Sequence, residues 1–391
     1  MLLLLLACGR ELDTGSAGVD SDSGDTGHPP GGGLDYDDGN FLYTTDHILE
    51  FGITLDEAAI AALAVDPSED VVATFTYEDE SYEVGLHLKG SPSGSFRTLD
   101  EKAAFKIDFH EWDREQEFHG VRRLTLNNMI QDSTMSHEHA AYWLFAEAGV
   151  VAPRHGYARV TVNGEWFGLY GIVETADEQL VNRHWPGDDE GHLYEGGYGS
   201  DLYEWAVEAF EMKEGDEADR ADLAALVEEV ESCGEGEILP LLERNFDVDA
   251  LLAAWAVELA IADPDGYTTL ANNYLLYYAP VAAQWTMIPW GPDQGFEGAA
   301  PIFTEMTGRL VEMCVADADC TGALRVATLA AVDTWESSGL GDFVNGETAR
   351  IEADCRADPR SEWGDNGCRD EQAAMREWVS ARPAAIRAEI E

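Results

Sequence analysis

The sequence predicts an α+β protein with a strand-rich N-terminal half and a mostly helical C-terminal half. From about residue 71, apolar and polar residues alternate in short segments separated by Gly and Ser turns, which is typical of β-strands. Beyond about residue 180, apolar residues recur at helical spacing over longer segments. The chain has 391 residues, of which 45% are hydrophobic, so it can bury a large core and is not disordered throughout.

The folded part is expected to begin near Phe41. A capping pattern at Thr54 and Glu57 opens an apolar run with helical period, which predicts a helix over 53–65. An Asn163-Gly164 pair between two apolar runs predicts a β-hairpin. The other elements predicted in this half are strands over 71–77, 80–89, 103–109 and 121–127, a helix over 133–148, and hairpin strands over 158–162 and 166–174.

The C-terminal half shows helical periodicity that one β-hairpin interrupts. Alternation in two short apolar segments predicts that hairpin, with strands over 274–278 and 285–290. Helices are predicted over 202–212, 219–231, 246–262, 322–336 and 370–389.

The charge of the chain excludes several classes of partner. There are 77 acidic residues against 23 Lys and Arg, which gives a formal net charge of −54. So acidic a surface repels phosphate backbones and anionic lipid, so we expect no nucleic-acid partner. Three of the four lysines, Lys89, Lys102 and Lys106, fall in one short segment. This cluster indicates either an anion site or ordinary lysines on a strand surface.

The N-terminus resembles a bacterial lipoprotein signal. Leu2 to Leu6 are followed by Ala7-Cys8, so residues 1–8 are expected to be the signal, with Cys8 as the lipidated residue. Residues 9–40 are rich in Gly, Ser and Asp and predict a disordered acidic linker. We therefore expect an exported lipoprotein of the cell envelope, in the outer membrane or at the cell surface. Its only membrane contact would be the lipid.

The remaining cysteines fit an exported protein. Cys314 with Cys320, and Cys355 with Cys368, lie in loops that are rich in Asp and Gly, and their spacing suggests two local disulfides. Cys233 is left over and is expected to be a partly buried thiol. The sequence alone leaves the connectivity open.

Two segments of the N-terminal half suggest an anion site. A strand ends at Lys89-Gly90, a turn of small residues follows, and Lys106 lies on the returning strand. Backbone N–H groups in such a turn, together with a lysine, can hold phosphates, although a plain hairpin has the same pattern. Glu174 ends an apolar strand, where an ionised carboxylate is costly unless paired. Lys106 is a plausible partner; an exposed glutamate at the strand end is the alternative.

A third segment, residues 261–296, carries the hard oxygen ligands that Mg²⁺ prefers. Asp265 follows a predicted helix, and the hairpin after it is expected to bring Asn273 and Asp293 together. An Asp beside an accepting hydroxyl can orient it for phosphoryl transfer. The alternative is that both Asp residues simply belong to turns.

These stretches resemble, in order, the CotH (spore coat protein H) kinase family, over roughly residues 50–300. The matching residues are Lys89-Gly90 with Lys102 and Phe105-Lys106-Ile107; Leu124-Thr125-Leu126 with Asp132 to Met135; Val162-Asn163-Gly164 with Gly168-Leu169-Tyr170 and Glu174; Asp265-Gly266-Tyr267 with Asn272-Asn273-Tyr274 and Tyr277; and Ile288-Pro289-Trp290 with Asp293.

The resemblance implies a two-lobed, atypical protein-kinase-like fold over residues 41–391, with lobes of about 41–180 and 181–391. It also implies ATP and Mg²⁺ or Mn²⁺ as cofactors. Carried over by position, Asp265 resembles the catalytic aspartate, and Asn273 and Asp293 resemble metal ligands. Lys106 resembles the nucleotide-phosphate lysine and Glu174 its ion-pair partner, with Lys89 and Gly90 in the phosphate turn.

One departure from the family pattern bears on activity. The family usually has Asp directly after the Pro-Trp pair, and this chain has Gly291 there. The resemblance implies an exported kinase that phosphorylates serine in secreted or surface proteins. Gly291 favours the alternative, a weak or inactive surface or adhesion protein that uses the fold as a binding scaffold. A phosphate-ester hydrolase is less favoured because the sequence shows no clear nucleophile.

Overall fold

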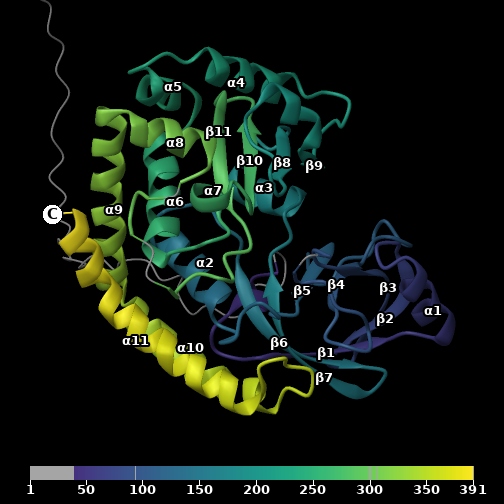
Figure 1. The fold of residues 1–391 in the computed structure, drawn as a ribbon. Helices are drawn as coiled ribbons and strands as arrows, with labels where there is room; N and C mark the ends of the chain where they lie inside the picture. The colour runs from purple at the N-terminus through teal and green to yellow at the C-terminus, as the bar shows by residue number, and fades with distance from the viewer. Residues whose placement is uncertain (1–38, 93, 299–300, 305, 391) are drawn as a thin grey trace, which may run out of the picture.

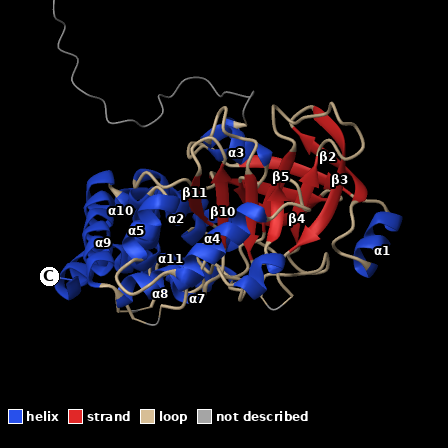
Figure 2. Ribbon diagram, turned by 90° about the horizontal axis from the view of Figure 1, so that it is seen from above, coloured by secondary structure: helices blue, strands red, loops and turns tan. Residues whose placement is uncertain are grey.

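The computed structural model describes residues 39–92, 94–298, 301–304 and 306–390. They form a β-barrel lobe and a mostly helical lobe that lie side by side (Figure 1). Viewed from above, the strands and helices separate clearly along the molecule (Figure 2). The predicted α+β class with strands first and helices second is therefore confirmed. The predicted signal, Cys8 and nearly all of the predicted linker lie outside the described residues.

Seven strands close the N-terminal barrel, and large apolar side chains such as Phe51, Phe75 and Phe105 fill its interior. The strands follow each other around the barrel in the order β1-β2-β3-β4-β5-β7-β6, and a parallel pair of β1 with β6 completes the ring. Their bounds are β1 Leu49–Thr54, β2 Val71–Tyr77, β3 Glu80–Lys89, β4 Ala104–Asp108, β5 Arg123–Asn127, β6 His155–Val162 and β7 Glu165–Val173.

The predicted helix over 53–65 is partly wrong, because its first residues belong to β1. In β1, alternate side chains are buried in the barrel and the intervening ones lie at or near the surface. The helix α1, Glu57–Val65, begins after Asp56, whose carboxylate accepts a hydrogen bond from Ala59 N at 2.7 Å. A short alternating segment directly before a helical period is easily absorbed into the helix when the sequence is read alone.

The helix α2, His137–Glu147, joins the barrel to the second lobe. It was predicted from residue 133, but Asp132 holds the chain in a turn before the helix. The Asp132 carboxylate accepts hydrogen bonds from Thr134 N at 2.9 Å and from His137 N at 2.7 Å. Side chains of α2 pack into the main core of the C-terminal lobe, so the first turn of α2 lies where the two lobes meet.

The C-terminal lobe holds a four-stranded sheet in the order β11-β10-β8-β9, with most of the helices around it. The strands are β8 His192–Gly196, β9 Glu211–Glu214, β10 Tyr274–Ala279 and β11 Gln284–Pro289. The helices are α3 Glu178–His184, α4 Ala221–Ser232, α5 Ile238–Asn245, α6 Val248–Ile261, α7 Tyr267–Leu270, α8 Arg309–Ala316, α9 Ala318–Ser338, α10 Leu340–Ala357 and α11 Gly364–Ile390. Two 3₁₀ helices are η1 Asn40–Tyr43 and η2 Glu204–Ala209.

The predicted helix over 202–212 is wrong. The chain forms the 3₁₀ helix η2 and then the strand β9, which pairs with β8. Pairing with a strand distant in sequence overrides the local helical pattern there. The predicted hairpin is confirmed as β10 and β11, while α10 was missed beyond the helix break at Gly339, whose φ is 82°.

Both predicted disulfides are present, Cys314–Cys320 and Cys355–Cys368. Cys233 is a free, partly buried thiol, as predicted. Among the described residues, no helix combines the length and apolar character that crossing a membrane requires.

Candidate functional site

A cleft of about 730 Å³ lies between the barrel and the C-terminal sheet. It is lined by six of the seven residues that the sequence singled out, from segments up to 204 residues apart, namely Lys89, Gly90, Lys106, Asp265, Asn273 and Asp293. The structure thus brings together the predicted phosphate turn and the predicted acidic loop. The seventh residue, Glu174, lies elsewhere.

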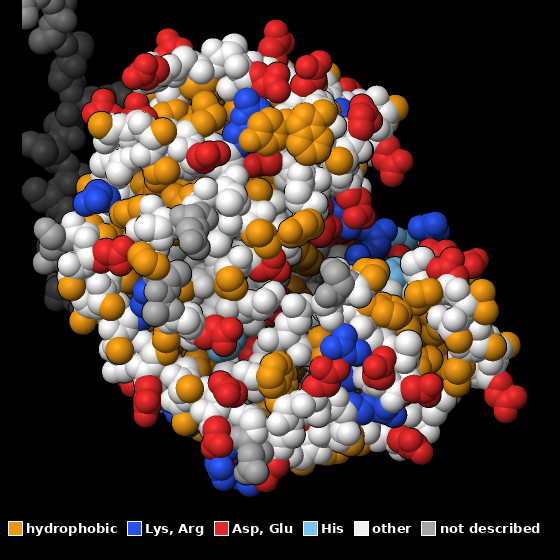
Figure 3. Space-filling view, viewed as in Figure 1, with side chains coloured by type: hydrophobic (Ala, Val, Ile, Leu, Met, Phe, Trp, Pro, Cys, Tyr) orange, Lys and Arg blue, Asp and Glu red, His pale blue; other side chains and the backbone are white. Residues whose placement is uncertain are grey.

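Three of the four lysines of the chain line this cleft. Lys106 projects from the middle of β4, Lys89 ends β3, and Lys213 comes from β9 in the other lobe. Burial lowers the pKa of Lys106 to about 8, and the neighbouring Lys213 and Lys89 add to the effect. No described residue forms an ion pair or hydrogen bond with the Lys106 ammonium group, so it is available to an external anion. Elsewhere, acidic side chains are scattered over the face that Figure 3 shows.

Two of the four lysines, Lys102 and Lys213, lie where the sequence did not predict them. Lys102 is not in the cleft, because its side chain is buried in an ion pair with Asp358. Lys213 was missed, because its strand was predicted as the end of a helix. It forms ion pairs with Glu195 at 3.1 Å and Glu211 at 2.9 Å.

Buried carboxyl groups also line the cleft, near Lys89. Glu138, in the first turn of α2, is 3% exposed and accepts a hydrogen bond from Asn127 Nδ2 at 2.8 Å. Burial raises the pKa of Glu138 to about 7, although Lys89 opposes the shift. Burial, followed by the charge of Glu138, also raises the pKa of Asp293 well above its usual range. Lys89 partly offsets the charge of Glu138 and Asp293. We call the part of the cleft around Glu138 and Asp293 the acidic end.

The donor set of the acidic end suits a divalent cation that arrives with phosphate ligands. Mg²⁺ is usually bound through one or two carboxylates together with substrate oxygens. Asn273 and Asp293 supply one amide oxygen and one carboxylate. Within the described ranges, no three His, Cys, Asp or Glu residues are arranged as a complete metal site. The residues therefore fit a metal held jointly with a ligand, rather than a closed structural site.

Three side-chain amides orient the Asp265 carboxylate. It accepts hydrogen bonds from Asn272 Nδ2 at 2.9 Å, Asn273 Nδ2 at 3.0 Å and Gln294 Nε2 at 3.2 Å. Because Asn273 turns its NH₂ group to Asp265, its carbonyl oxygen is left as an acceptor. This arrangement fixes the direction of the carboxylate and leaves it partly exposed at the cleft.

Two buried carboxyl groups support the loop that carries Asp265. Asp263 accepts a hydrogen bond from Asp265 N at 3.0 Å, and Glu258 accepts one from Thr268 N at 2.9 Å. Burial raises the pKa of Glu258 to about 8 and that of Asp263 to about 7. Both groups are 3% exposed. The loop is therefore built on carboxyls that favour their protonated form near neutral pH.

The predicted Lys106–Glu174 ion pair is wrong. Lys106 lies in register with Thr125, which pairs with Val173, so these three residues form one row across the sheet. Glu174 follows Val173, and successive side chains of an extended chain point to opposite faces. Glu174 instead binds two arginines, Arg154 at 2.8 Å and Arg183 at 2.5 Å.

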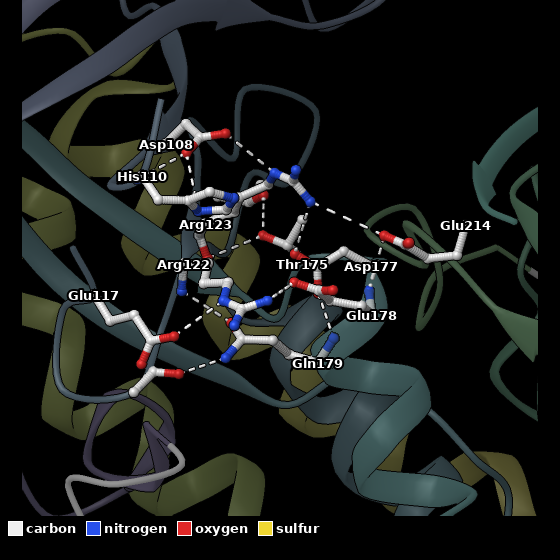
Figure 4. A network of polar contacts seen from close by, with 12 residues as sticks. Asp108, His110, Glu117, Arg122, Arg123, Thr175, Asp177, Glu178, Gln179 and Glu214 are labelled. Carbon is white, nitrogen blue, oxygen red and sulfur yellow. Dashed lines mark hydrogen bonds and ion pairs between the residues drawn. The ribbon is translucent and has the colours of Figure 1, made fainter. Parts of the chain in front are cut away.

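A polar network beside the cleft connects the two lobes (Figure 4). Arg123 on β5 lies 3.2 Å from Asp108, 3.6 Å from Asp177 and 4.0 Å from Glu214 of β9. Asp177 caps α3 by accepting a hydrogen bond from Gln179 N at 3.0 Å. Since Glu214 is the neighbour of Lys213, this network fixes the strand that brings Lys213 to the cleft.

A family model described as CotH kinase protein matches residues 86–319, which is more than half of the chain. The chain belongs to the CotH kinase family. Among curated proteins, it is 22% identical over 237 residues to the inner spore coat protein H of Bacillus subtilis (strain 168), covering 58% of this chain. The match spans 62% of the length of that relative.

Two solved structures are also similar to this CotH family member. One is a Shewanella oneidensis MR-1 complex of the toxin–antitoxin system HipA and HipB with operator DNA, at 12% identity and a TM-score of 0.39, covering 89% of this chain and 75% of that one. The other is the Helicobacter pylori proinflammatory kinase CtkA, at 7% identity and a TM-score of 0.34, covering 78% of this chain and 95% of that one.

The stability contributed by four buried carboxyl groups is expected to fall as pH rises from about 4 to about 8. The native state binds the protons of Glu138, Asp177, Glu258 and Asp263 more tightly than the unfolded chain does, and each such group destabilises the native state once it must ionise. Glu258→Gln, which mimics the protonated form, should reduce the loss by on the order of 3 kcal/mol, at about 1.4 kcal/mol per pKa unit. Urea unfolding at pH 5 and pH 8 gives the change in the free energy of unfolding between the two pH values for the wild type and the variant. The same change in both proteins would contradict the assignment of this pH dependence to Glu258.

Glu174→Gln is expected to lower the free energy of unfolding by about 3 kcal/mol, because it leaves Arg154 and Arg183 without their shared buried carboxylate. Urea unfolding measures the loss. Glu165→Gln, which changes an exposed carboxylate on the same segment of chain, is the matched control. Equal stability of the two variants would show that the Glu174 ion pairs contribute little.

Proposed function

We propose that this chain is an exported atypical kinase that transfers the γ-phosphoryl group of ATP to serine in secreted or surface proteins, with Mg²⁺ or Mn²⁺. The observation that carries the proposal is the convergence of Lys89, Lys106 and Lys213 with Asp265, Asn273 and Asp293 in one cleft. Membership of the CotH kinase family supports the reaction class. Serine and the protein substrate follow from the family resemblance noted in the sequence.

The cleft offers different surfaces to the parts of a nucleotide. Val173 and Ala176, where the chain leaves the barrel, supply apolar surface for a base. Lys106 and Lys213 line the same cleft and supply positive charge for phosphates. Gly90 opens the turn over this region with φ of 125°, and a Cβ there would lie 2.7 Å from the Phe96 backbone. Only glycine therefore allows so close an approach of the two arms of the turn.

Residues at the acidic end would hold the metal. Asn273 and Asp293 are the proposed ligands, and a bound divalent cation would neutralise charge on the phosphates and on the carboxylates. Lys89 lies close enough to Glu138 for each to shift the pKa of the other. A net charge of −54 opposes the entry of free ATP, so binding is expected to depend on the metal.

Asp265 is the proposed catalytic residue. Its carboxylate, directed by Asn272, Asn273 and Gln294, would accept the hydrogen bond of the substrate hydroxyl and align its oxygen with the γ-phosphorus. As the bond to phosphorus forms, the hydroxyl proton would pass to this carboxylate. The leaving group is ADP.

We also propose export as a lipoprotein anchored at Cys8, with the protein in the outer membrane or at the cell surface. Two disulfides in the folded part support an oxidising compartment.

Gly291 favours a second candidate function, a binding scaffold with weak or no activity. This residue stands where the family pattern has Asp, so a carboxylate is missing beside Asn273. The backbone at Gly291 has φ of 58°, and an added Cβ would meet Asn273 Nδ2 at 3.5 Å, an ordinary contact. The position therefore has room for the missing side chain.

Asp265→Asn is expected to lower phosphoryl transfer by roughly 10²–10⁴-fold, because the amide cannot accept the hydroxyl proton. Binding of Mg·ATP should remain, since Asp265 is not among the proposed ligands. The measurement is transfer from labelled ATP to the chain itself and to a generic basic protein, alongside a thermal-shift titration with Mg·ATP. Asp249→Asn, at an exposed site of α6, is the control. Equal transfer by both variants would refute the assignment, and a wild-type chain with no metal-dependent ATP shift would favour the scaffold.

Gly291→Asp is expected to lower by about tenfold the Mn²⁺ concentration needed for half-maximal ATP binding, a gain of about 1.4 kcal/mol. The added carboxylate would strengthen the ligand set of Asn273 and Asp293. Gly291→Asn provides the control, because it imposes the same backbone cost, about 1 kcal/mol, without the charge. If both variants require as much Mn²⁺ as the wild type, the metal does not bind at this position.

A further inference from the structure

The connection between α10 and α11 lies against the barrel, although it is more than 250 residues away in sequence from the loop it touches (Figure 1). We call residues 358–363 of this connection the strap. It contacts the loop that runs from the Gly90 turn to Lys102, at Arg97, Asp100, Glu101 and Lys102. The strap also lies beyond the residues that the family model matches, which end at 319.

A buried ion pair anchors the start of the strap. Lys102 Nζ lies 2.7 Å from Asp358 Oδ2, and the two side chains are 1% and 0% exposed. The same carboxylate accepts a hydrogen bond from Leu169 N at 2.9 Å. Gly168 makes this approach possible, since a Cβ there would lie 2.6 Å from Asp358 Oδ2. Neither charge is solvated, so each depends on the other for its burial.

A second contact holds the turn itself. Arg97 donates hydrogen bonds from Nη1 to the carbonyl oxygens of Gly94 at 2.9 Å and Phe96 at 2.8 Å. Glu362 of the strap binds the other edge of the same guanidinium, at 2.6 Å from Nε and 3.1 Å from Nη2. This two-bond pairing fixes the plane of the guanidinium, and thereby the carbonyls that it holds.

Two more contacts complete the attachment. Trp363 Nε1 donates a hydrogen bond to Ile130 O at 3.2 Å, next to Gln131, which lines the cleft beside Gly94. Arg360 donates to the carbonyl oxygens of Asp100 at 2.9 Å and Glu101 at 3.1 Å. The disulfide Cys355–Cys368 closes the base of the connection, so the strap has little freedom to move away.

We infer that the strap is a positioning element for Gly94 and Ser95 in the turn after Gly90, and that it keeps these cleft-lining residues in the conformation that binds phosphate. The strap contacts Arg97, Asp100, Glu101, Lys102 and Ile130. None of the strap residues lines the cleft. The inference rests on the proposed kinase function where it concerns nucleotide. The conformation of the turn can be measured without nucleotide.

The test uses the full chain with the double substitution Glu362→Gln and Trp363→Phe, which removes the Glu362 and Trp363 contacts and leaves the buried Lys102–Asp358 pair and the Arg360 contacts intact. The matched control is Glu229→Gln with Trp112→Phe. It makes the same chemical changes in a carboxylate of α4 that pairs with Arg244 and is 48% exposed, against 49% for Glu362, and in a tryptophan that is 47% exposed, against 45% for Trp363.

Hydrogen exchange without nucleotide is the first readout. The amides of Gly94, Phe96 and Glu101 are hydrogen-bonded within the loop. In the strap variant they should exchange roughly tenfold faster, which corresponds to about 1.4 kcal/mol of lost protection, while the control matches the wild type. Unchanged exchange in the strap variant would overturn the inference whatever happens to ATP.

Mg·ATP affinity and transfer kinetics are the second readout. The dissociation constant and the KM for ATP should rise by no more than the factor by which the exchange rate rises, because only the ordered turn binds and the apparent affinity scales with the fraction of chains in which the turn is ordered. The kcat at saturating ATP should stay within about twofold, since binding restores the turn. A rise in the dissociation constant that the control variant shows equally would also overturn the positioning role. If even the wild type fails to bind Mg·ATP, the kinase proposal fails, and the exchange result still decides whether the strap orders the turn.

Replacing the disulfide gives an independent check. Cys355→Ser with Cys368→Ser should shift loop exchange in the same direction, because it frees the base of the strap. Cys314→Ser with Cys320→Ser removes a disulfide elsewhere in the C-terminal lobe and serves as the control. Equal loop exchange in the two variants would show that the strap is held without its disulfide.

Discussion

The acidic end of the cleft is the constraint on which the site depends. Glu138 and Asp293 are buried close together, and Lys89 only partly offsets their charge. Burying them therefore destabilises the folded chain, because the ionised carboxyls lose their solvation without full pairing. The surrounding elements maintain this arrangement. The turn of α2 fixes Glu138, the end of β3 fixes Lys89, and the loop after β11 fixes Asp293. Buried groups with such strongly shifted pKa values are candidates for a functional site, and a ligand of opposite charge would stabilise them.

Much of the site was predictable because its residues lie at the ends of local elements. Lys89 ends a strand, Gly90 opens a turn, and Asp265 and Asn273 flank a short helix before a hairpin. Such positions have a signature in the local pattern of turns and apolar residues, and the family resemblance placed them in order. The barrel strands from β2 to β5 were predicted almost to the residue, since each alternates and ends at a turn.

The errors at the cleft share a physical cause, which is contact between segments distant in sequence. The sequence showed Glu174 at the end of an apolar strand but not the face on which it lies, and that face is set by registry with β5. Glu138 was missed because a glutamate in the first turn of a helix is ordinarily solvated, and only the packing of α2 buries it. Lys213 was missed because β9 forms only where β8 is available. The local pattern of apolar and polar residues does not predict which distant segments pack against these residues.

The parallel pair of β1 with β6 also determines how this molecule must assemble. Leu49 pairs with Ala158, and Arg97 pairs with Glu362, which is 265 residues away in sequence. Closing the barrel and attaching the strap therefore each bring distant segments together, which costs the unfolded chain conformational entropy. Topologies of this kind fold slowly. The two halves of the cleft come from different lobes, so neither lobe can form it alone. The complete cleft therefore exists only once both lobes have folded and come together.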